Sequence, residues 1–172
     1  MADHTVRAYT EELESLSGEI SRMGGLAESL VSDAIDAVAR RDPALAESVV
    51  ERDGAVDQLQ REIEKRIIRI LALRQPMGKD LREAIAALKI AADLERVADL
   101  GKNIAKRTRQ LIDHDAAWPL RGAERMGRLV LVQLHQVLDA YASRDTAEAV
   151  RVWYMDEEID EHYNSLFREM LT

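Results

Sequence analysis

Apolar residues recur at alternating steps of three and four positions along most of the chain. Such spacing places the side chains on one face of an α-helix, as a helix that packs in a bundle requires. The first apolar line predicts a helix over residues 5–40, and its members are Leu13, Leu16, Ile20, Met23, Ala27, Leu30, Ala34 and Val38.

A second helix is predicted to begin at Asp42-Pro43, because Asp is a favoured N-cap residue and Pro is favoured at the first helical position. It should end before Gln75-Pro76, since the residue that precedes a proline is disfavoured in the helical conformation. Its predicted core line includes a carboxylate and an amide among apolar residues: Ala46, Val49, Asp53, Val56, Gln60, Ile63, Ile67 and Ile70.

The third helix has two neighbouring lines. In the first, two carboxylates continue an apolar face: Leu81, Ile85, Leu88, Ala92, Glu95 and Asp99. The second line contains Ile90, Leu94, Val97, Gly101 and Ile104. Residues 113–122, with Trp118-Pro119 inside, are predicted to form a linker, followed by a fourth helix over 123–143 and a fifth from Thr146 to the last residue.

The chain contains an internal repeat. Residues 22–68 and 125–171 align without a gap at an offset of 103 positions, with 14 identities over 47 positions. At this offset Asp53 and Asp57 coincide with Asp156 and Asp160, whereas the equivalent of Glu95 would be position 198. We therefore predict an all-α fold of tandem three-helix repeats. Residues 1–112 form the first repeat, 113–122 the linker, and 123–172 the first two helices of an incomplete second repeat.

The absence of a third helix from the second repeat has a physical consequence. The fourth and fifth helices are expected to expose an apolar seam, which swapping, dimerisation or folding back would bury.

Composition limits the function. The net charge of −8 disfavours nucleic-acid and anionic-membrane binders, because phosphate-rich partners require a basic face. Cysteine is absent, which fits a reducing compartment and excludes thiolate chemistry. No signal peptide or membrane-spanning run is recognised, so a cytoplasmic location is expected.

Three acidic pairs at i, i+4 spacing carry the candidate chemistry, since residues four apart on a helix point to the same side. A carboxylate directed at an apolar core is costly unless a cation meets it. The pairs therefore predict binding of a divalent or trivalent metal ion (Mg²⁺, Mn²⁺, Ca²⁺, Zn²⁺ or iron), because hard cations prefer carboxylate oxygens. The candidate ligands are Asp53, Asp57, Glu95, Asp99, Asp156 and Asp160, with Asn103 as a further candidate.

An ion-pair network is the alternative interpretation of these residues, with Arg96, Lys89 or Arg52 supplying the counter-charge. The basic cluster that ends the third helix is interpreted as complementing the helix dipole; it contains Lys102, Lys106, Arg107 and Arg109. Gly24-Gly25, inside a helical pattern, is interpreted as allowing close helix packing.

The segments 70–77 (ILALRQPM), 93–99 (DLERVAD) and 152–160 (VWYMDEEID) closely resemble the PhoU family of phosphate-responsive regulators. The resemblance implies two similar three-helix bundles laid side by side. It implies a cytoplasmic negative regulator of the phosphate-starvation response, which acts by contact and catalyses no reaction. The implied partners are the ATPase of the high-affinity phosphate transporter and a two-component sensor histidine kinase, and the membrane is reached only through them.

The resemblance also implies that the acidic motifs bind metal clusters, and we expect a homodimer. The sequence departs from the family pattern at its end, where a further helix with a second acidic run is expected. Two other functions remain open: a metal-dependent enzyme with a carboxylate-bridged centre, and a purely structural helical scaffold.

Overall fold

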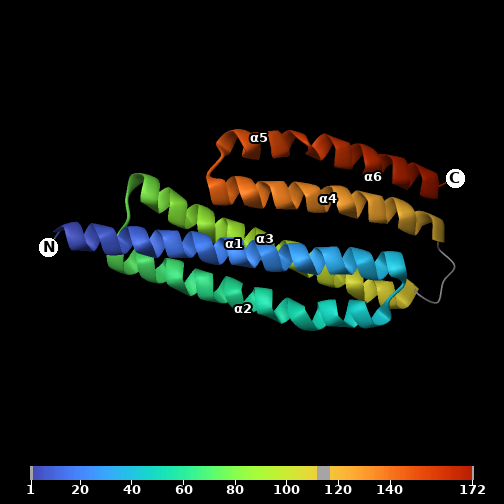
Figure 1. The fold of residues 1–172 in the computed structure, drawn as a ribbon, viewed down its shortest axis with the longest axis horizontal. Helices are drawn as coiled ribbons and strands as arrows, with labels where there is room; N and C mark the ends of the chain where they lie inside the picture. The colour runs from blue at the N-terminus through green and yellow to red at the C-terminus, as the bar shows by residue number, and fades with distance from the viewer. Residues whose placement is uncertain (1, 112–116, 172) are drawn as a thin grey trace.

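The computed structural model describes the backbone of residues 2–111 and 117–171, and the side chains of residues 11–111, 121–169 and 171. Every element in these ranges is a helix: α1 (Ala2–Arg40), α2 (Pro43–Arg74), α3 (Gly78–Leu111), α4 (Ala117–Ser143), α5 (Thr146–Tyr154) and α6 (Asp156–Met170). Helices α1–α3 form one bundle, α4 lies along α1, and α5 and α6 lie on the outer side of α4 (Figure 1). The predicted all-α fold is confirmed.

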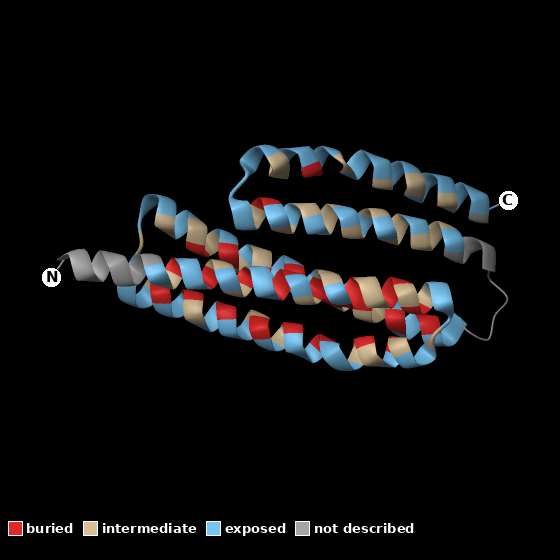
Figure 2. Cartoon of the chain, in the orientation of Figure 1, coloured by how far each residue is buried: buried red, intermediate tan, exposed pale blue. Residues whose placement is uncertain are grey.

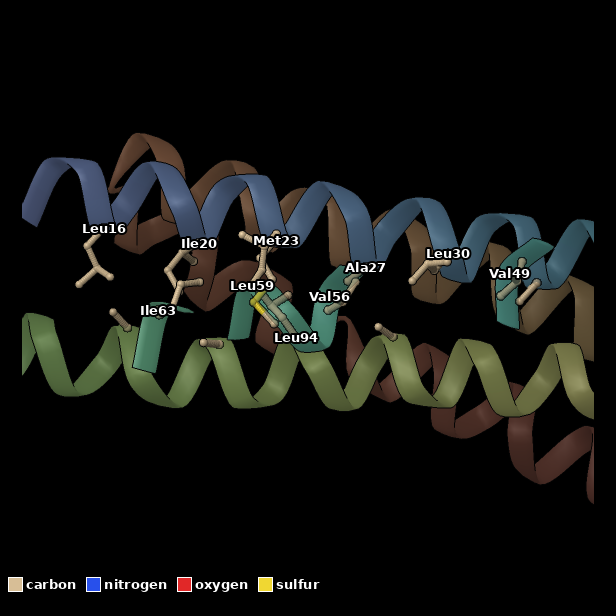
Figure 3. Packing of buried hydrophobic residues seen from close by; sticks show 14 of the residues in the cluster. Leu16, Ile20, Met23, Ala27, Leu30, Val49, Val56, Leu59, Ile63 and Leu94 are labelled. Carbon is tan, nitrogen blue, oxygen red and sulfur yellow. The ribbon is translucent and has the colours of Figure 1, made fainter. Parts of the chain in front are cut away.

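The core of the first bundle forms where the predicted lines of α1 and α2 meet α3. Figure 3 shows the side chains of α1 pointing into the space between the other two helices. In α2, Leu59 takes the buried position that the sequence pattern assigned to Gln60, which is half-buried. The largest fully buried side chains are Leu16, Ile20, Met23, Val49, Val56, Ile63 and Ile67. Among the described helices, none is both long and apolar enough to cross a membrane.

The core line of α3 differs from the predicted one. The buried residues are mostly small: Ala84, Ala87, Ala91, Leu94, Ala98, Gly101, Ala105 and Thr108. Leu81 is 40% exposed, and Glu95 and Asp99 are half-buried at the edge of the interface. The reason is steric, because small residues let α3 approach α1 closely. A Cβ at Gly101 would lie 3.3 Å from Val31 Cα.

The same turn follows the first helix of each repeat. Arg41 and Arg144 have positive φ values of 53° and 56°. The backbone N–H groups of Asp42 and Asp145 donate to carbonyls five residues back, at 3.0 and 2.9 Å, as in a Schellman ending. The two Asp side chains then cap α2 and α5. Equivalent positions of the two repeats therefore adopt the same local structure.

Helices α1 and α4 pack through a reciprocal pair of glycine contacts. A Cβ at Gly24 would overlap the side chain of Leu138, and a Cβ at Gly127 would lie 2.8 Å from Ile35 Cδ1. The two contacts are related by the 103-residue offset, since Gly127 corresponds to Gly24 and Leu138 to Ile35. This is the pattern of an isologous interface, formed here within one chain. It confirms the packing role expected of Gly24.

The second repeat differs from the prediction in two places. Helix α4 begins at Ala117, so residues 117–122 of the predicted linker are helical, while 112–116 lie outside the described residues. The predicted fifth helix is divided at Met155, where the backbone N–H bonds to the Val152 carbonyl at 3.0 Å. Asp156 consequently lies exposed at the start of α6 instead of on a buried seam. A carboxylate is favourable there because the helix dipole is positive at its N-terminus.

The second repeat buries much less of its apolar line than the first. Buried residues are concentrated in α1–α3 (Figure 2), and among the described residues of α4–α6 only Ala140 and Val152 are buried. Ala34 is fully buried, whereas its equivalent Val137 is 39% exposed. In the first repeat α3 packs against both α1 and α2 and covers their apolar lines. The exposed apolar seam predicted for this repeat is confirmed.

Replacement of Gly101 by Leu should lower the free energy of unfolding by roughly 1–3 kcal/mol, the usual cost of overpacking. The matched control is Gly54→Ala on α2, where nothing lies within 4 Å of an added Cβ. Alanine is favoured over glycine inside a helix by about 0.5–1 kcal/mol, so the control should gain stability. Urea unfolding of both variants measures the difference. A gain of stability in both would contradict the close approach of α1 and α3.

Candidate functional site

Lys102 brings Asp53 of α2 and Asp99 of α3 together. Its Nζ lies 2.6 Å from Asp53 Oδ2 and 2.7 Å from Asp99 Oδ1. The spacing of three residues between Asp99 and Lys102 places both on one side of α3. The lysine therefore joins the two helices through a pair of charge-assisted hydrogen bonds.

The environment of the ion pair explains why a cation is needed. The Asp53 side chain is only 6% exposed, because Asp53 lies on the buried line of α2 between Val49 and Val56. Lys102 is 20% exposed and Asp99 is 44% exposed. Removing a carboxylate from water costs several kcal/mol, and a paired ammonium offsets that cost. Asp53 Oδ1 nevertheless remains buried without a hydrogen-bond partner.

The electrostatics match this geometry. The hydrogen bonds to Asp53 and then to Asp99 raise the pKa of Lys102 above its ordinary value. The hydrogen bond from Lys102 holds the pKa of the Asp99 carboxyl below its ordinary value. Lys102 and Asp99 are therefore both charged at neutral pH, which is the state that an ion pair requires.

The other predicted ligands of the first repeat lie beside this ion pair. Asp57 and Glu95 are half-buried, and each is one helical turn from its partner. Asp57 and Glu95 both lie on the side nearer to the α2–α3 connection, because the two helices are antiparallel. The Asn103 amide donates to Asp99 Oδ2 at 3.1 Å. Within the described residues, no group of three or more histidine, aspartate and glutamate side chains is placed to hold a metal ion.

The predicted ligands of the second repeat have no ion pair or facing carboxylates of this kind. Asp156 and Asp160 are both exposed on α6. Residues 1–172 hold no counterpart of the Glu95/Asp99 pair that would face them. The structure thus assembles part of the candidate set in the first repeat and leaves these two carboxylates in solvent.

Lys102 has a different role from the one that the sequence pattern predicted. The sequence pattern placed it among the cations that complement the end of α3. Arg52, proposed as a partner of the acidic pairs, instead forms an ion pair with Asp33 of α1. The available signal was the spacing from Asp99 to Lys102, which is a favourable distance for a helical ion pair.

The first-repeat residues have suitable donor chemistry for a metal ion but are not placed to hold one in this structure. Four carboxylates and an amide are a suitable donor set for a hard cation, and Asp53 Oδ1 has no partner. The Lys102 ammonium, however, lies between the two carboxylates that meet across α2 and α3. A metal ion bound by both carboxylates therefore requires that Lys102 withdraw.

Comparison with protein families gives a match over most of the chain. A family model described as the PhoU domain matches residues 20–108 and 123–172. A phosphate-specific transport system accessory protein PhoU homolog of Caulobacter vibrioides (strain NA1000 / CB15N) is 54% identical over 173 residues, covering 100% of this chain and 75% of the relative. The accessory protein PhoU of Escherichia coli (strain K12) is 35% identical over 169 residues, covering 98% and 70%.

Two crystal structures are similar to the fold. PhoU from Pseudomonas aeruginosa matches with a TM-score of 0.92 and 34% identity, over 95% of this chain and 78% of that one. The phosphate transport system regulatory protein PhoU from Streptococcus pneumoniae matches with a TM-score of 0.88 and 32% identity, over 95% and 77%.

Replacement of Lys102 by Met should lower the free energy of unfolding by roughly 3 kcal/mol, because the Asp53 carboxylate would be buried without a counter-charge. The double variant Asp53→Leu/Lys102→Met should recover most of this loss, since apolar residues often replace a buried ion pair at little cost. Lys106→Met removes an exposed cation one turn away and is the matched control. If urea unfolding gave equal stabilities for the two lysine variants, the ion pair would not stabilise the fold.

Proposed function

Since this chain belongs to the PhoU family, we propose that it is an accessory regulator of phosphate transport. The observation that carries the proposal is 54% identity across the whole chain to a phosphate-specific transport system accessory protein. The two relatives described above are named as accessory proteins, and the Streptococcus pneumoniae structure is named as a regulatory protein. The chain is accordingly a regulatory protein and not an enzyme.

The proposal extends to partners and location. The protein acts in the cytoplasm, contacts the ATPase of the high-affinity phosphate transporter and a sensor histidine kinase, and represses the phosphate-starvation response when phosphate is plentiful. The net charge of −8 supports protein partners over nucleic acid. The proposal includes association with a second copy of the chain, supported by the exposed aromatic side chains of α5, since Trp153 is 80% exposed and Tyr154 is 68% exposed.

The proposal also includes a metal ion in the first repeat, with ligands drawn from Asp53, Asp57, Glu95 and Asp99. Its support is the donor chemistry and the unpartnered oxygen of Asp53. A bound cation would neutralise carboxylates at the α2–α3 edge and make that edge available to an anionic or carbonyl-bearing partner surface.

A structural role for the acidic residues is the second candidate, and the Lys102 bridge favours it. In that case the ion pair holds α2 against α3, and no metal ion takes part. The two candidates make different predictions for metal binding.

Deletion of the host's own copy should activate a phosphate-starvation reporter in phosphate-rich medium, and the full chain should restore repression. Affinity purification of the tagged chain from detergent-solubilised cells should recover the transporter ATPase and the sensor kinase, as identified by mass spectrometry. The same tag on an unrelated acidic helical protein is the control. Restored repression without recovery of either partner would contradict regulation by contact.

Mn²⁺ affinity should fall at least about tenfold in Asp53→Asn/Glu95→Gln, because that variant removes two of the four first-repeat carboxylates. The matched control is Asp156→Asn/Asp160→Asn, which makes the same charge change on exposed residues of α6. Isothermal titration calorimetry on the folded proteins measures both. Undetectable binding in all three proteins would favour the structural role.

A further inference from the structure

The C-terminal part of α2 concentrates positive charge on an acidic protein. Residues 65–74 contain four cations and no acidic residue: Lys65, Arg66, Arg69 and Arg74. The whole chain has a net charge of −8, so the other residues carry −12 once these four positive charges are set aside. Helix α2 lies on the side of α1 opposite to α4 (Figure 1), and its described residues contact none of α4, α5 and α6. The second repeat therefore leaves this segment uncovered.

The four cations line a groove between α2 and α1. The groove has a volume of about 470 Å³. Two of the cations already have carboxylate partners on α1. Arg74 donates hydrogen bonds of 2.8 and 3.2 Å to Glu12, and Arg66 forms an ion pair with Glu19. Besides the four cations, the lining of the groove includes Glu12, Ile70 and Leu73.

Lys65 and Arg69 have no such partner. Both side chains are exposed, and neither forms an ion pair with a residue that the structure describes. They are four residues apart on α2, so they lie one turn apart on the same side of the helix. Leu73 continues this line at the next turn and is 68% exposed. The groove therefore offers two uncommitted cations beside one uncovered aliphatic side chain.

The groove stabilises negative charge. The hydrogen bond from Arg74 holds the pKa of the Glu12 carboxyl below its ordinary value, and the charges of Arg66 and Arg69 lower it further. Arg69 thus acts on a carboxylate to which it is not hydrogen-bonded. A second carboxylate that entered the groove beside Lys65 and Arg69 would experience the same positive potential.

We propose that this groove is a docking surface for an acidic amphipathic helix of a partner protein. Carboxylates of the partner helix pair with Lys65 and Arg69, and its apolar face covers Leu73. Side chains four residues apart on a helix recur about every 6 Å, so carboxylates at that spacing match the two cations. A helix that lies in an amphipathic groove is a common mode of recognition. The inference rests on the contact-partner part of the proposed function and is independent of the metal ion.

Size distinguishes an acidic helix from other anions. A helix is about 10 Å across, so it can lie over the groove alone. A bilayer or a nucleic-acid duplex would extend past the groove and meet exposed acidic residues such as Glu14 and Glu64. An inorganic phosphate ion would pair with the cations but would leave Leu73 exposed. The combination of two cations and an aliphatic side chain therefore favours an acidic helix.

Fluorescence anisotropy of the full chain with a labelled synthetic peptide tests the surface. The peptide has about 20 residues, which is long enough to be helical in water, with glutamates four apart on one face and leucines on the adjacent face. Its affinity should fall at least about tenfold in Lys65→Glu/Arg69→Glu, because two attractive charge contacts become repulsive. A second peptide with lysine at every glutamate position should bind this variant and not the unmodified chain.

The matched control is Lys106→Glu/Arg107→Glu, which makes the same charge change on exposed residues of α3 at the opposite end of the bundle. It should bind the acidic peptide as the unmodified chain does. Equal affinity in the two variants would overturn the proposal, as would no binding of the acidic peptide by the unmodified chain. Binding of sodium phosphate or of phosphatidylglycerol vesicles in place of the peptide, lost in Lys65→Glu/Arg69→Glu, would overturn it in favour of that anion.

A measurement on the unmodified chain covers the case in which Lys65→Glu/Arg69→Glu folds poorly. Brief acetylation followed by mass spectrometry should show slower labelling of Lys65 when the acidic peptide is bound and unchanged labelling of Lys106. Bound peptide that leaves Lys65 labelling unchanged would overturn the proposal. Peptide binding at the groove without recovery of the transporter ATPase or the sensor kinase from cells would reject those proposed partners alone.

Discussion

The close approach of α3 to α1 is the constraint on which the rest of the structure depends. The buried line of α3 is mostly alanine and glycine, and Gly101 lies against the backbone of Val31. Helix α2 packs against both α1 and α3. Asp53 lies on the buried line of α2 and within reach of Lys102 of α3. The ion pair is therefore a consequence of helix packing as much as of charge.

The same constraint explains why the two repeats differ despite their similar sequences. In the first repeat α3 covers the apolar lines of α1 and α2. Among the described residues of α4–α6, all but Ala140 and Val152 are half-buried or exposed. A groove of about 720 Å³ lies between α3 and α4. The residues that line it include Ile90, Val97, Leu134, Leu138 and Tyr141.

Hydrophobic periodicity predicted α1 and α2 well because their core residues are large and carry a strong signal. It predicted the wrong line for α3, since alanine contributes little to an apolar pattern and larger residues flank the true interface. Glu95 and Asp99 were therefore expected on the core face and lie at its edge. Lys102 was missed because its role depends on Asp53, a residue of another helix. The break at Met155 interrupts a continuous helical pattern in the sequence, so the pattern did not predict it.

The reciprocal contacts between α1 and α4 limit how the two repeats can move. Gly24 and Ile35 are eleven residues apart, which is about 16 Å along a helix at 1.5 Å per residue. Two interlocked points at that separation block sliding and twisting of one repeat along the other. Rocking about the line through both points is the motion that remains. A partner that binds one repeat would therefore tilt the other repeat about this line as a rigid body.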